Sequence, residues 1–213
     1  MKNLIITGGS GLLALNWAFF KKNDVEITLL LHNRKVSIEG VNSVFTNLES
    51  LDSIYKFLSK NNNAVIIHCA ANTSIDDCEK NPKFAYETNV QISKNLAKVC
   101  FKLGLKLVHI STDHLFSGAS SFYSECSEIC PQNVYGDSKA KAEINVMNEN
   151  PDSLIIRTNF FCWGTPYRIS FSDFLINSIR EKKKIFLYTD IFYTPIYLKN
   201  LIMIIQSLFF KIR

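Results

Sequence analysis

Short apolar runs recur along the chain and are separated by mixed segments of helical length. Five of these runs predict largely buried strands, at residues 4–7, 25–31, 43–46, 64–69 and 105–111. Helix signals fill the gaps: an apolar segment over 11–22, a cap at Ser50, and an Asn81-Pro82 start that runs to Gly104. Strands that alternate with helices in this way predict βαβ units. Right-handed crossovers then give an α/β doubly wound parallel sheet, the Rossmann fold.

The first strand ends at a glycine-rich turn. Gly8 and Gly11 follow Thr7, and Ala14 stands where the dinucleotide-binding fingerprint takes glycine or alanine. A helix that begins on such a turn presents free backbone N–H groups at the positive end of its dipole, which suits a phosphate or pyrophosphate. An ordinary tight turn is the alternative, but the position between a strand and a helix favours a phosphate site.

The end of the second strand indicates which dinucleotide fits. NAD sites usually place an acid there for the ribose hydroxyls, whereas this chain has His32, Asn33, Arg34 and Lys35. Two adjacent cations suit the 2′-phosphate of NADPH better than a bare ribose. An ordinary basic loop is the alternative interpretation. We therefore predict NADP as the cofactor, with NADPH preferred over NADH.

Further polar residues follow the fifth strand and start the next helix. Thr112 falls at the carboxyl edge of the predicted sheet, where ligands of such folds bind. Tyr135 and Lys139 are four residues apart and so share one face of a helix. A nearby ammonium lowers the pKa of a phenol and makes it a usable acid or base near neutral pH. Such pairs are common on solvated helix surfaces, but the glycine turn and the strand-end hydroxyl favour a catalytic role.

Composition narrows the class of protein. An apolar fraction of 47% and a net charge of +5 are ordinary for a soluble globular chain. The basic residues are scattered apart from 182–184, which we interpret as a solvated helix end, so no nucleic-acid partner is expected. The six cysteines form no C-x-x-C pair, no apolar run reaches the length of a membrane span, and no signal peptide is predicted. These features predict a cytoplasmic protein with free thiols and no metal site.

The motifs together resemble the extended short-chain dehydrogenase/reductase family. Within it, the similarity is greatest to the dTDP-4-dehydrorhamnose reductase branch, which includes a non-enzymatic relative, the regulatory subunit of methionine adenosyltransferase. The matching segments occur in family order and cover most of the chain: residues 7–13, 68–79 with Pro82 and Asn89, 111–116, 131–143 and 157–164.

The resemblance implies roles for individual residues. Tyr135 would protonate the carbonyl oxygen that is reduced, Thr112 would hydrogen-bond the same oxygen, and Lys139 would hold the nicotinamide ribose. The cofactor would lie against Gly8, Ser10, Gly11, Leu12, Asn33, Arg34, Asn47, Leu48, Ala70, Ala71, Asn72, Tyr135 and Lys139. The substrate would lie against Asp113, His114, Phe116, Asn159 and Trp163.

The resemblance also implies a division of the chain. Residues 1–150 would form an NAD(P)-binding Rossmann domain. Residues 151–213 would add the last strand or strands of the sheet and a small, shortened C-terminal substrate lobe that is not an independent domain. We expect this lobe to contain residues 153–158, a helix capped by Ser170 with Asp173 in the capping-box position, residues 185–188 and the final helix.

Two departures from the family pattern bear on the substrate. His114 stands where the branch carries an aromatic residue, and it is either a structural residue or a contact to a changed substrate. Relatives continue beyond residues 195–201 with further substrate-domain elements, whereas this chain ends at Arg213. The aromatic residues of the lobe either contact the substrate or pack the lobe against the main domain: Phe160, Phe161, Trp163, Tyr167, Phe171 and Phe174.

The sequence thus predicts an enzyme: an NADPH-dependent reductase of a nucleotide-linked 4-keto-6-deoxy sugar, in surface polysaccharide biosynthesis. One alternative is a sugar-nucleotide epimerase or dehydratase of the same family. A second alternative is a non-catalytic NADP-binding regulatory subunit. The nucleotide sugar is the expected partner, and the helices from Pro82 and Tyr135 are candidates for pairing in a homodimer.

Overall fold

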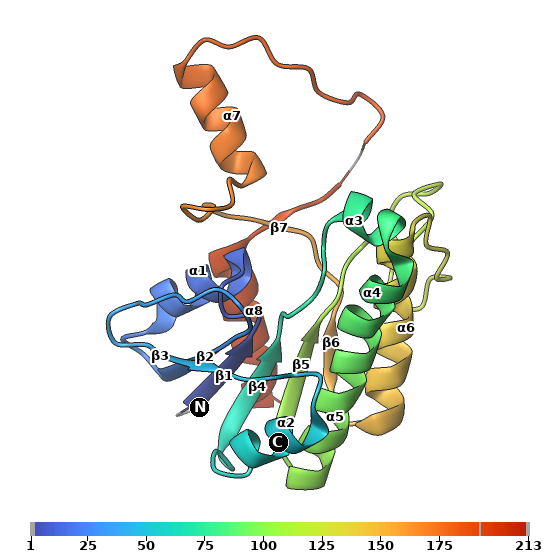
Figure 1. Ribbon diagram of the computed structural model, residues 1–213. Coiled ribbons are helices and arrows are strands. Elements are labelled where there is room, and N and C mark those ends of the chain that lie inside the picture. The colour runs from blue at the N-terminus through green and yellow to red at the C-terminus, as the bar shows by residue number, and fades with distance from the viewer. Residues whose placement is uncertain (1–2, 192, 212–213) are drawn as a thin grey trace.

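The core of the molecule is a six-stranded parallel sheet in the order β3-β2-β1-β4-β5-β6 (Figure 1). The computed structural model describes residues 3–191 and 193–211. The strands are β1 Asn3–Thr7, β2 Glu26–Leu31, β3 Asn42–Phe45, β4 Ala64–His68, β5 Lys106–Ile110 and β6 Leu154–Ile156. This order confirms the predicted doubly wound fold. The strand order reverses between β1 and β4, and ligands of such sheets bind beside that point, at the carboxyl ends of the strands.

Helices cover both faces of the sheet (Figure 1). The long ones are α1 Leu12–Lys21, α2 Leu51–Leu58, α5 Ile92–Leu103, α6 Val134–Glu149 and α8 Leu198–Lys211. Between β4 and α5 the chain forms α3 Ile75–Lys80, α4 Pro82–Tyr86 and a π-helical turn, η1 Glu87–Gln91. The helix predicted from Pro82 to Gly104 is therefore present without a break, as α4, η1 and α5 in succession. Its middle turn is π-helical, and such turns often occur at functional sites.

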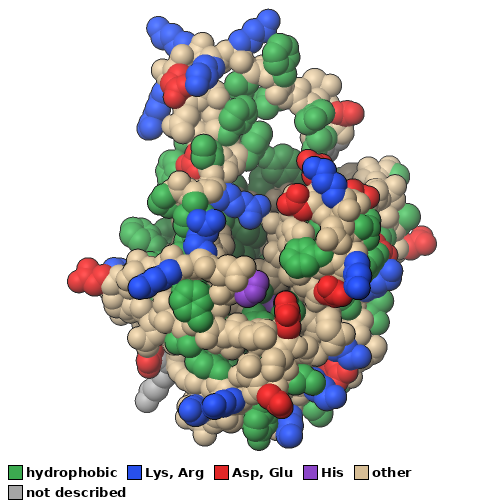
Figure 2. Space-filling model, in the orientation of Figure 1, with side chains coloured by type: hydrophobic (Ala, Val, Ile, Leu, Met, Phe, Trp, Pro, Cys, Tyr) green, Lys and Arg blue, Asp and Glu red, His purple; other side chains and the backbone are tan. Residues whose placement is uncertain are grey.

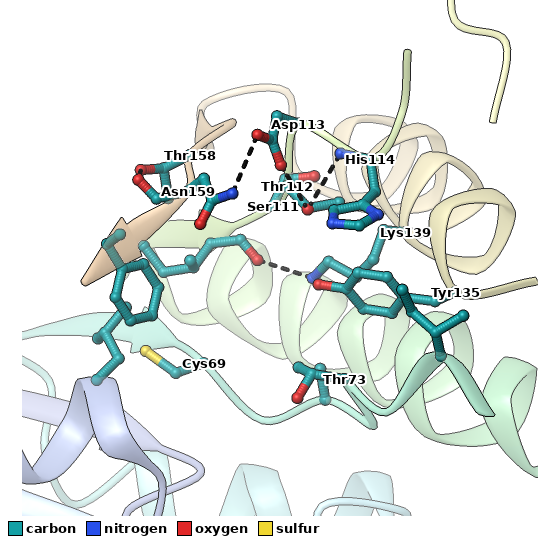
Figure 3. Close-up of a pocket in the computed structure, with 15 residues that line it drawn as sticks. Cys69, Thr73, Ser111, Thr112, Asp113, His114, Tyr135, Lys139, Thr158 and Asn159 are labelled. Atoms are coloured by element: carbon teal, nitrogen blue, oxygen red, sulfur yellow. Dashed lines mark hydrogen bonds between the residues drawn. The ribbon is translucent and has the colours of Figure 1, made fainter. Parts of the chain in front are cut away.

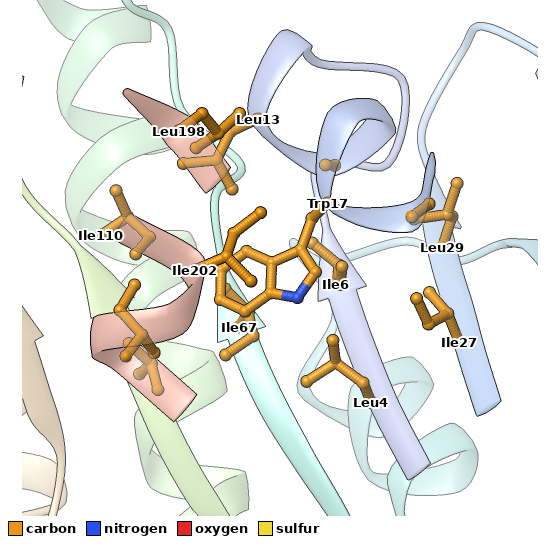
Figure 4. Packing of buried hydrophobic residues seen from close by; sticks show 14 of the residues in the cluster. Leu4, Ile6, Leu13, Trp17, Ile27, Leu29, Ile67, Ile110, Leu198 and Ile202 are labelled. Atoms are coloured by element: carbon orange, nitrogen blue, oxygen red, sulfur yellow. The ribbon is translucent and has the colours of Figure 1, made fainter. Parts of the chain in front are cut away.

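Successive side chains of each strand point to opposite faces of the sheet and pack into two separate hydrophobic cores. Leu4, Ile6 and Ile67 pack with Trp17 of α1 on one face (Figure 4). Ile5 and its neighbours on β4 and β5 pack against α2, α5 and α6 on the other face. Both faces are buried because a parallel sheet carries its crossover helices on both sides, so the strands have near-continuous apolar sequences.

The final helix belongs to the main domain, and its assignment to the substrate lobe is wrong. Leu198, Leu201, Ile202 and Ile205 of α8 are buried in the same cluster as Trp17 (Figure 4). These positions follow the i, i+3, i+4, i+7 spacing of one helical face. The helix therefore covers sheet surface that α1 leaves open.

The predicted helix caps are present. The Ser50 side chain accepts a hydrogen bond from the Ser53 amide, and Asn81 accepts from the Phe84 amide. Gly104 ends α5 in the left-handed conformation at φ 64°. Ser170 and Asp173 form the expected capping box at the start of α7 Phe171–Arg180.

Residues 162–195 leave the main domain as an excursion that contains α7 (Figure 1). Its two ends are joined by a short parallel pair, β7 Phe160–Phe161 with β8 Ile196–Tyr197. Residues 182–184 are exposed just after α7, as predicted for a solvated helix end. Figure 2 shows that the molecule is hollowed between this excursion and the main domain, with Lys and Arg side chains at the edge. We call residues 162–195 the lobe.

No helix among the described residues is long and apolar enough to cross a membrane. No group of three or more His, Cys, Asp or Glu side chains in the same residues is placed to hold a metal ion.

Candidate active site and cofactor groove

The glycine turn leads from β1 into the N-terminus of α1 at the carboxyl edge of the sheet. Gly8 has a φ of +66°, and a Cβ atom there would lie 2.9 Å from the backbone nitrogen of Ala70. Gly11 caps α1 without any side-chain hydrogen bond to the first turn. Free backbone donors at a helix start, beside a turn that admits no side chain, form a suitable cradle for a phosphate group.

A buried chain of hydrogen bonds ties this turn to β4 and α5. The Thr7 hydroxyl oxygen accepts from the backbone N–H groups of Cys69 and Ala70, at 3.1 and 3.2 Å. The hydroxyl therefore donates to Nδ1 of His68, 2.7 Å away. Nε2 of His68 donates to Ser93, at 2.9 Å, whose own hydroxyl donates to the Asn89 carbonyl. His68 is thus held as the neutral Nε2–H tautomer.

Burial, and secondarily the charge of Lys139, lowers the pKa of His68 from 6.5 to about 3. Because the unfolded chain binds the proton first as the pH falls, stability due to His68 is present above about pH 6.5 and is lost below it. We expect the free energy of unfolding to fall by about 2 kcal/mol between pH 7 and pH 5 from this residue alone. Urea unfolding at the two pH values measures the loss.

A matched variant isolates this effect. His68→Gln keeps a polar side chain that does not titrate, so its stability should change less between pH 7 and pH 5 than that of the wild type. An exposed histidine, His32→Gln, is the control and should leave the wild-type pH dependence in place. An identical pH dependence in His68→Gln and wild type would contradict the assignment.

A pocket of about 250 Å³ opens where the carboxyl ends of β4 and β5 meet α6 (Figure 3). Thr112, His114 and Tyr135 lie together on one side of it, and the His114 and Tyr135 rings meet edge to face with centroids 5.6 Å apart. Fifteen residues line the pocket: Leu13, Cys69, Ala71, Thr73, Ile75, Ile110, Ser111, Thr112, Asp113, His114, Tyr135, Lys139, Thr158, Asn159 and Phe160.

The pKa of Tyr135 is raised above its usual value, contrary to the expected lowering. Burial of the phenol is the main cause, and a hydrogen bond with Thr112 and the charge of Arg168 lower the pKa by less than burial raises it. The ammonium of Lys139 donates its hydrogen bonds to Ile110 and His109 and forms none with the phenol. Tyr135 is therefore a protonated phenol at neutral pH, the form that a proton donor requires.

Lys139 is buried, at 3% exposure, beneath the pocket. Its ammonium donates to the Ile110 carbonyl at 2.7 Å and to Nε2 of His109 at 3.2 Å. Burial lowers the pKa of Lys139 to about 8, and burial together with this ammonium keeps the pKa of His109 well below 6.5. Two of the three N–H donors of Lys139 have partners among the described residues, which leaves one donor for a ligand in the pocket.

Asn89 fixes the loop after β4 against α6, a role that the sequence patterns did not indicate. Its side-chain oxygen accepts from the Asn72 amide at 2.7 Å, and its nitrogen donates to the Asn72 carbonyl and to Ser138. The Ser138 hydroxyl donates to the Tyr135 carbonyl at 2.7 Å. The only sequence signal was Asn89 in the family segment. The π-helical turn, which contains Asn89, is not visible in the sequence.

The structure brings some of the candidate residues together and separates others. Thr112, Asp113, His114, Tyr135, Lys139, Asn159 and Ala71 line the pocket. Gly8, Ser10, Gly11, Leu12, Ala70 and Asn72 lie on the adjoining turn, α1 and the β4 loop, with Asn33 and Arg34 past the end of β2. Asn47 and Leu48 are outside the pocket lining; Asn47 accepts from the Glu49 amide, and Leu48 is a core residue.

Phe116 and Trp163 are likewise outside the lining of the pocket. Phe116 stacks on Tyr123, with ring centroids 4.5 Å apart. Trp163 is half exposed and contributes its carbonyl oxygen to Asn16. Phe160, one of the aromatic residues expected either to contact the substrate or to pack the lobe, is in the lining. Cys69 and Ser111 also line the pocket but were not among the predicted site residues, and their position at strand ends was the available signal.

Comparisons with known proteins agree with this architecture. The model of the family described as RmlD substrate binding domain matches residues 1–212. The chain is 31% identical over 153 residues to a probable low-salt glycan biosynthesis reductase of Haloferax volcanii, covering 70% of this chain and 51% of that protein. It is 31% identical over 161 residues to a dTDP-4-dehydrorhamnose reductase of Aggregatibacter actinomycetemcomitans, covering 75% and 52%.

A solved structure extends the similarity to the lobe. The dTDP-4-dehydrorhamnose reductase of Bacillus anthracis, in complex with NADP, superposes with a TM-score of 0.83 at 27% identity, covering 98% of this chain and 71% of that one. By contrast, the chain spans only about half the length of the two curated relatives.

Proposed function

Because the chain belongs to the RmlD substrate binding domain family, we propose that it is an NADPH-dependent reductase of a nucleotide-linked 4-keto-6-deoxy sugar. The observation that carries the proposal is the placement of Thr112, Tyr135 and Lys139 around one pocket next to the glycine turn. We assign the reaction to surface polysaccharide biosynthesis in the cytoplasm, with a homodimer as the working form.

The groove fits a dinucleotide phosphate. A Cβ atom at Gly8 would collide with the loop after β4, so the turn is kept clear of side chains. The start of α1 has no side-chain cap, and Arg34 adds a cation beyond the end of β2. The third N–H of the Lys139 ammonium has no partner in the part of the chain that the structure describes and would bind a ribose hydroxyl. NADPH would supply a hydride when bound.

In the proposed mechanism, the protein contributes a proton and a fixed geometry. Thr112 and Tyr135 both donate hydrogen bonds to the carbonyl oxygen of the sugar, which polarises the carbonyl before the hydride reaches its carbon. As negative charge develops on that oxygen, Tyr135 transfers its phenolic proton to it. Lys139, whose ammonium is held by the Ile110 carbonyl and His109 at the pocket lining, would hold the nicotinamide ribose with its remaining N–H.

Direct assay tests the proposal. The purified protein is mixed with NADPH and a dTDP-linked 4-keto-6-deoxy sugar, and consumption of NADPH is followed by absorbance. We expect stoichiometric formation of the 4-hydroxy sugar. Interconversion of a nucleotide sugar without net loss of NADPH would favour the epimerase alternative. Binding without turnover of any keto sugar would favour the regulatory subunit.

The cofactor preference is tested at Arg34. Arg34→Ala should weaken NADPH binding by about 10- to 100-fold, the value of a charge-assisted phosphate contact, and should leave NADH binding nearly unchanged. Isothermal titration calorimetry with each nucleotide measures both affinities. Lys60→Ala removes the same charge before β4, at the opposite edge of the sheet, and serves as the control. Equal losses for NADPH and NADH would refute the 2′-phosphate assignment.

A further inference from the structure

A tight hairpin of the lobe lies against the glycine turn. Thr165 and Arg168 exchange two backbone hydrogen bonds of 2.8 and 3.1 Å, which leaves Pro166 and Tyr167 at the tip. The Tyr167 hydroxyl donates to the carbonyl oxygen of Ser10, 2.6 Å away. The hairpin therefore reaches from the lobe to the turn that we assign to the cofactor phosphates.

The same tyrosine ring supports the cation assigned to the 2′-phosphate. The guanidinium carbon of Arg34 lies 4.0 Å from the centroid of the Tyr167 ring. A cation at this distance from an aromatic ring is attracted to it. Arg34 forms no ion pair with any carboxylate among the described residues. One face of its guanidinium is therefore covered, while its edge donors remain available to an anion.

The hairpin is held in place by the lobe helix and by α1. Asp173, the third residue of α7 and a member of its capping box, accepts a hydrogen bond from the Gly164 amide at 2.7 Å. A Cβ atom at Gly164 would lie 2.5 Å from the Arg168 carbonyl, so the chain is closely packed there. Asn16 of α1 donates to the Trp163 carbonyl at 2.9 Å. The hairpin that places Tyr167 against Arg34 is therefore held by hydrogen bonds to both α7 and α1.

We propose that Tyr167 is a specificity residue for the 2′-phosphate of NADPH, acting as a positioning residue for Arg34. An unsupported arginine side chain on the surface samples many rotamers and loses that freedom on binding. Stacking on Tyr167 restricts Arg34 beforehand, so less freedom is lost when the phosphate binds. This inference rests on the proposed NADPH site and adds a lobe residue to it.

The test uses two ligands that differ only in the 2′-phosphate, adenosine 2′,5′-bisphosphate and AMP, with affinities measured by calorimetry. Tyr167→Leu removes the ring and should weaken the bisphosphate about fivefold, with little change for AMP. Tyr167→Phe keeps the ring, loses the Ser10 hydrogen bond, and should retain the discrimination. In an Arg34→Ala background, Tyr167→Leu should have no further effect on the bisphosphate.

The outcomes separate the two proposals. If the wild type does not prefer the bisphosphate to AMP, the NADPH assignment itself fails. If it does prefer the bisphosphate and Tyr167→Leu preserves that preference, only the role of Tyr167 fails. Equal weakening of both ligands would show a general packing role and would also overturn the specificity assignment. Thermal unfolding of each variant confirms that it is folded.

Discussion

Replacing Tyr135 by phenylalanine is expected to lower kcat about a thousandfold while leaving the affinity for NADPH nearly unchanged. The substitution removes one hydroxyl from a ring that is otherwise retained, so the pocket keeps its shape. The lost group is the proton donor, and its raised pKa means that wild-type Tyr135 carries its proton throughout the neutral range. Steady-state turnover with a 4-keto sugar nucleotide, together with calorimetric NADPH binding, checks both parts.

The chain offers a matched control for this change. Tyr86→Phe removes another phenol that contacts the first turn of α6, where its hydroxyl donates to Asp137. That hydrogen bond is outside the pocket lining, so turnover should stay within a few-fold of wild type. Wild-type turnover in Tyr135→Phe would refute the mechanism. A large loss in Tyr86→Phe would show instead that the start of α6, and not the proton, limits the rate.

The local patterns of this sequence were sufficient to predict its first five strands and its helix caps. Leu4 and Ile6 pack in one core and Ile5 in the other, because successive side chains of a strand point to opposite faces of the sheet. Ser50 and Ser170 cap helices because their side-chain oxygens reach amides only three residues away. Both partners of such a contact lie within a few residues of each other, so a local sequence pattern is enough to predict it.

Long-range contacts were beyond such patterns. The sequence places Lys139 one helical turn from Tyr135 on α6. The direction of its ammonium, however, depends on Ile110 and His109, which lie on β5. The spacing of apolar residues in α8 indicated a helix, but it did not indicate which surface of the protein that helix would cover. The contact between Tyr167 and Arg34 joins residues that only the folded lobe brings together. In each case the contacting residues are far apart in the sequence, and only the arrangement of strands and helices in the fold brings them together.

The ion pair between Arg157 and Glu143 is another long-range contact that local sequence patterns did not predict. Breaking it is expected to have the largest effect on stability. Arg157, just after β6, donates from Nε and Nη2 to both carboxylate oxygens of Glu143 on α6, at 2.8 to 3.1 Å. The Glu143 side chain is only 6% exposed. Its negative charge also raises the pKa of Lys139, opposing the effect of burial. The pair thus joins β6 to the helix that carries Tyr135 and Lys139.

Arg157→Ala should lower the free energy of unfolding by about 3 kcal/mol, because it leaves the buried Glu143 carboxylate without its partner. For a chain of this size that corresponds to a fall in Tm of roughly 6–12 °C, measurable by thermal unfolding. Adding Glu143→Gln to Arg157→Ala removes the unpaired charge and should recover part of the loss. Lys141→Ala breaks the exposed pair with Asp137 and should cost less than about 1 kcal/mol. If Arg157→Ala is no more damaging than Lys141→Ala, then β6 and α6 are held together by their apolar contacts, and the geometry of the pocket does not depend on this pair.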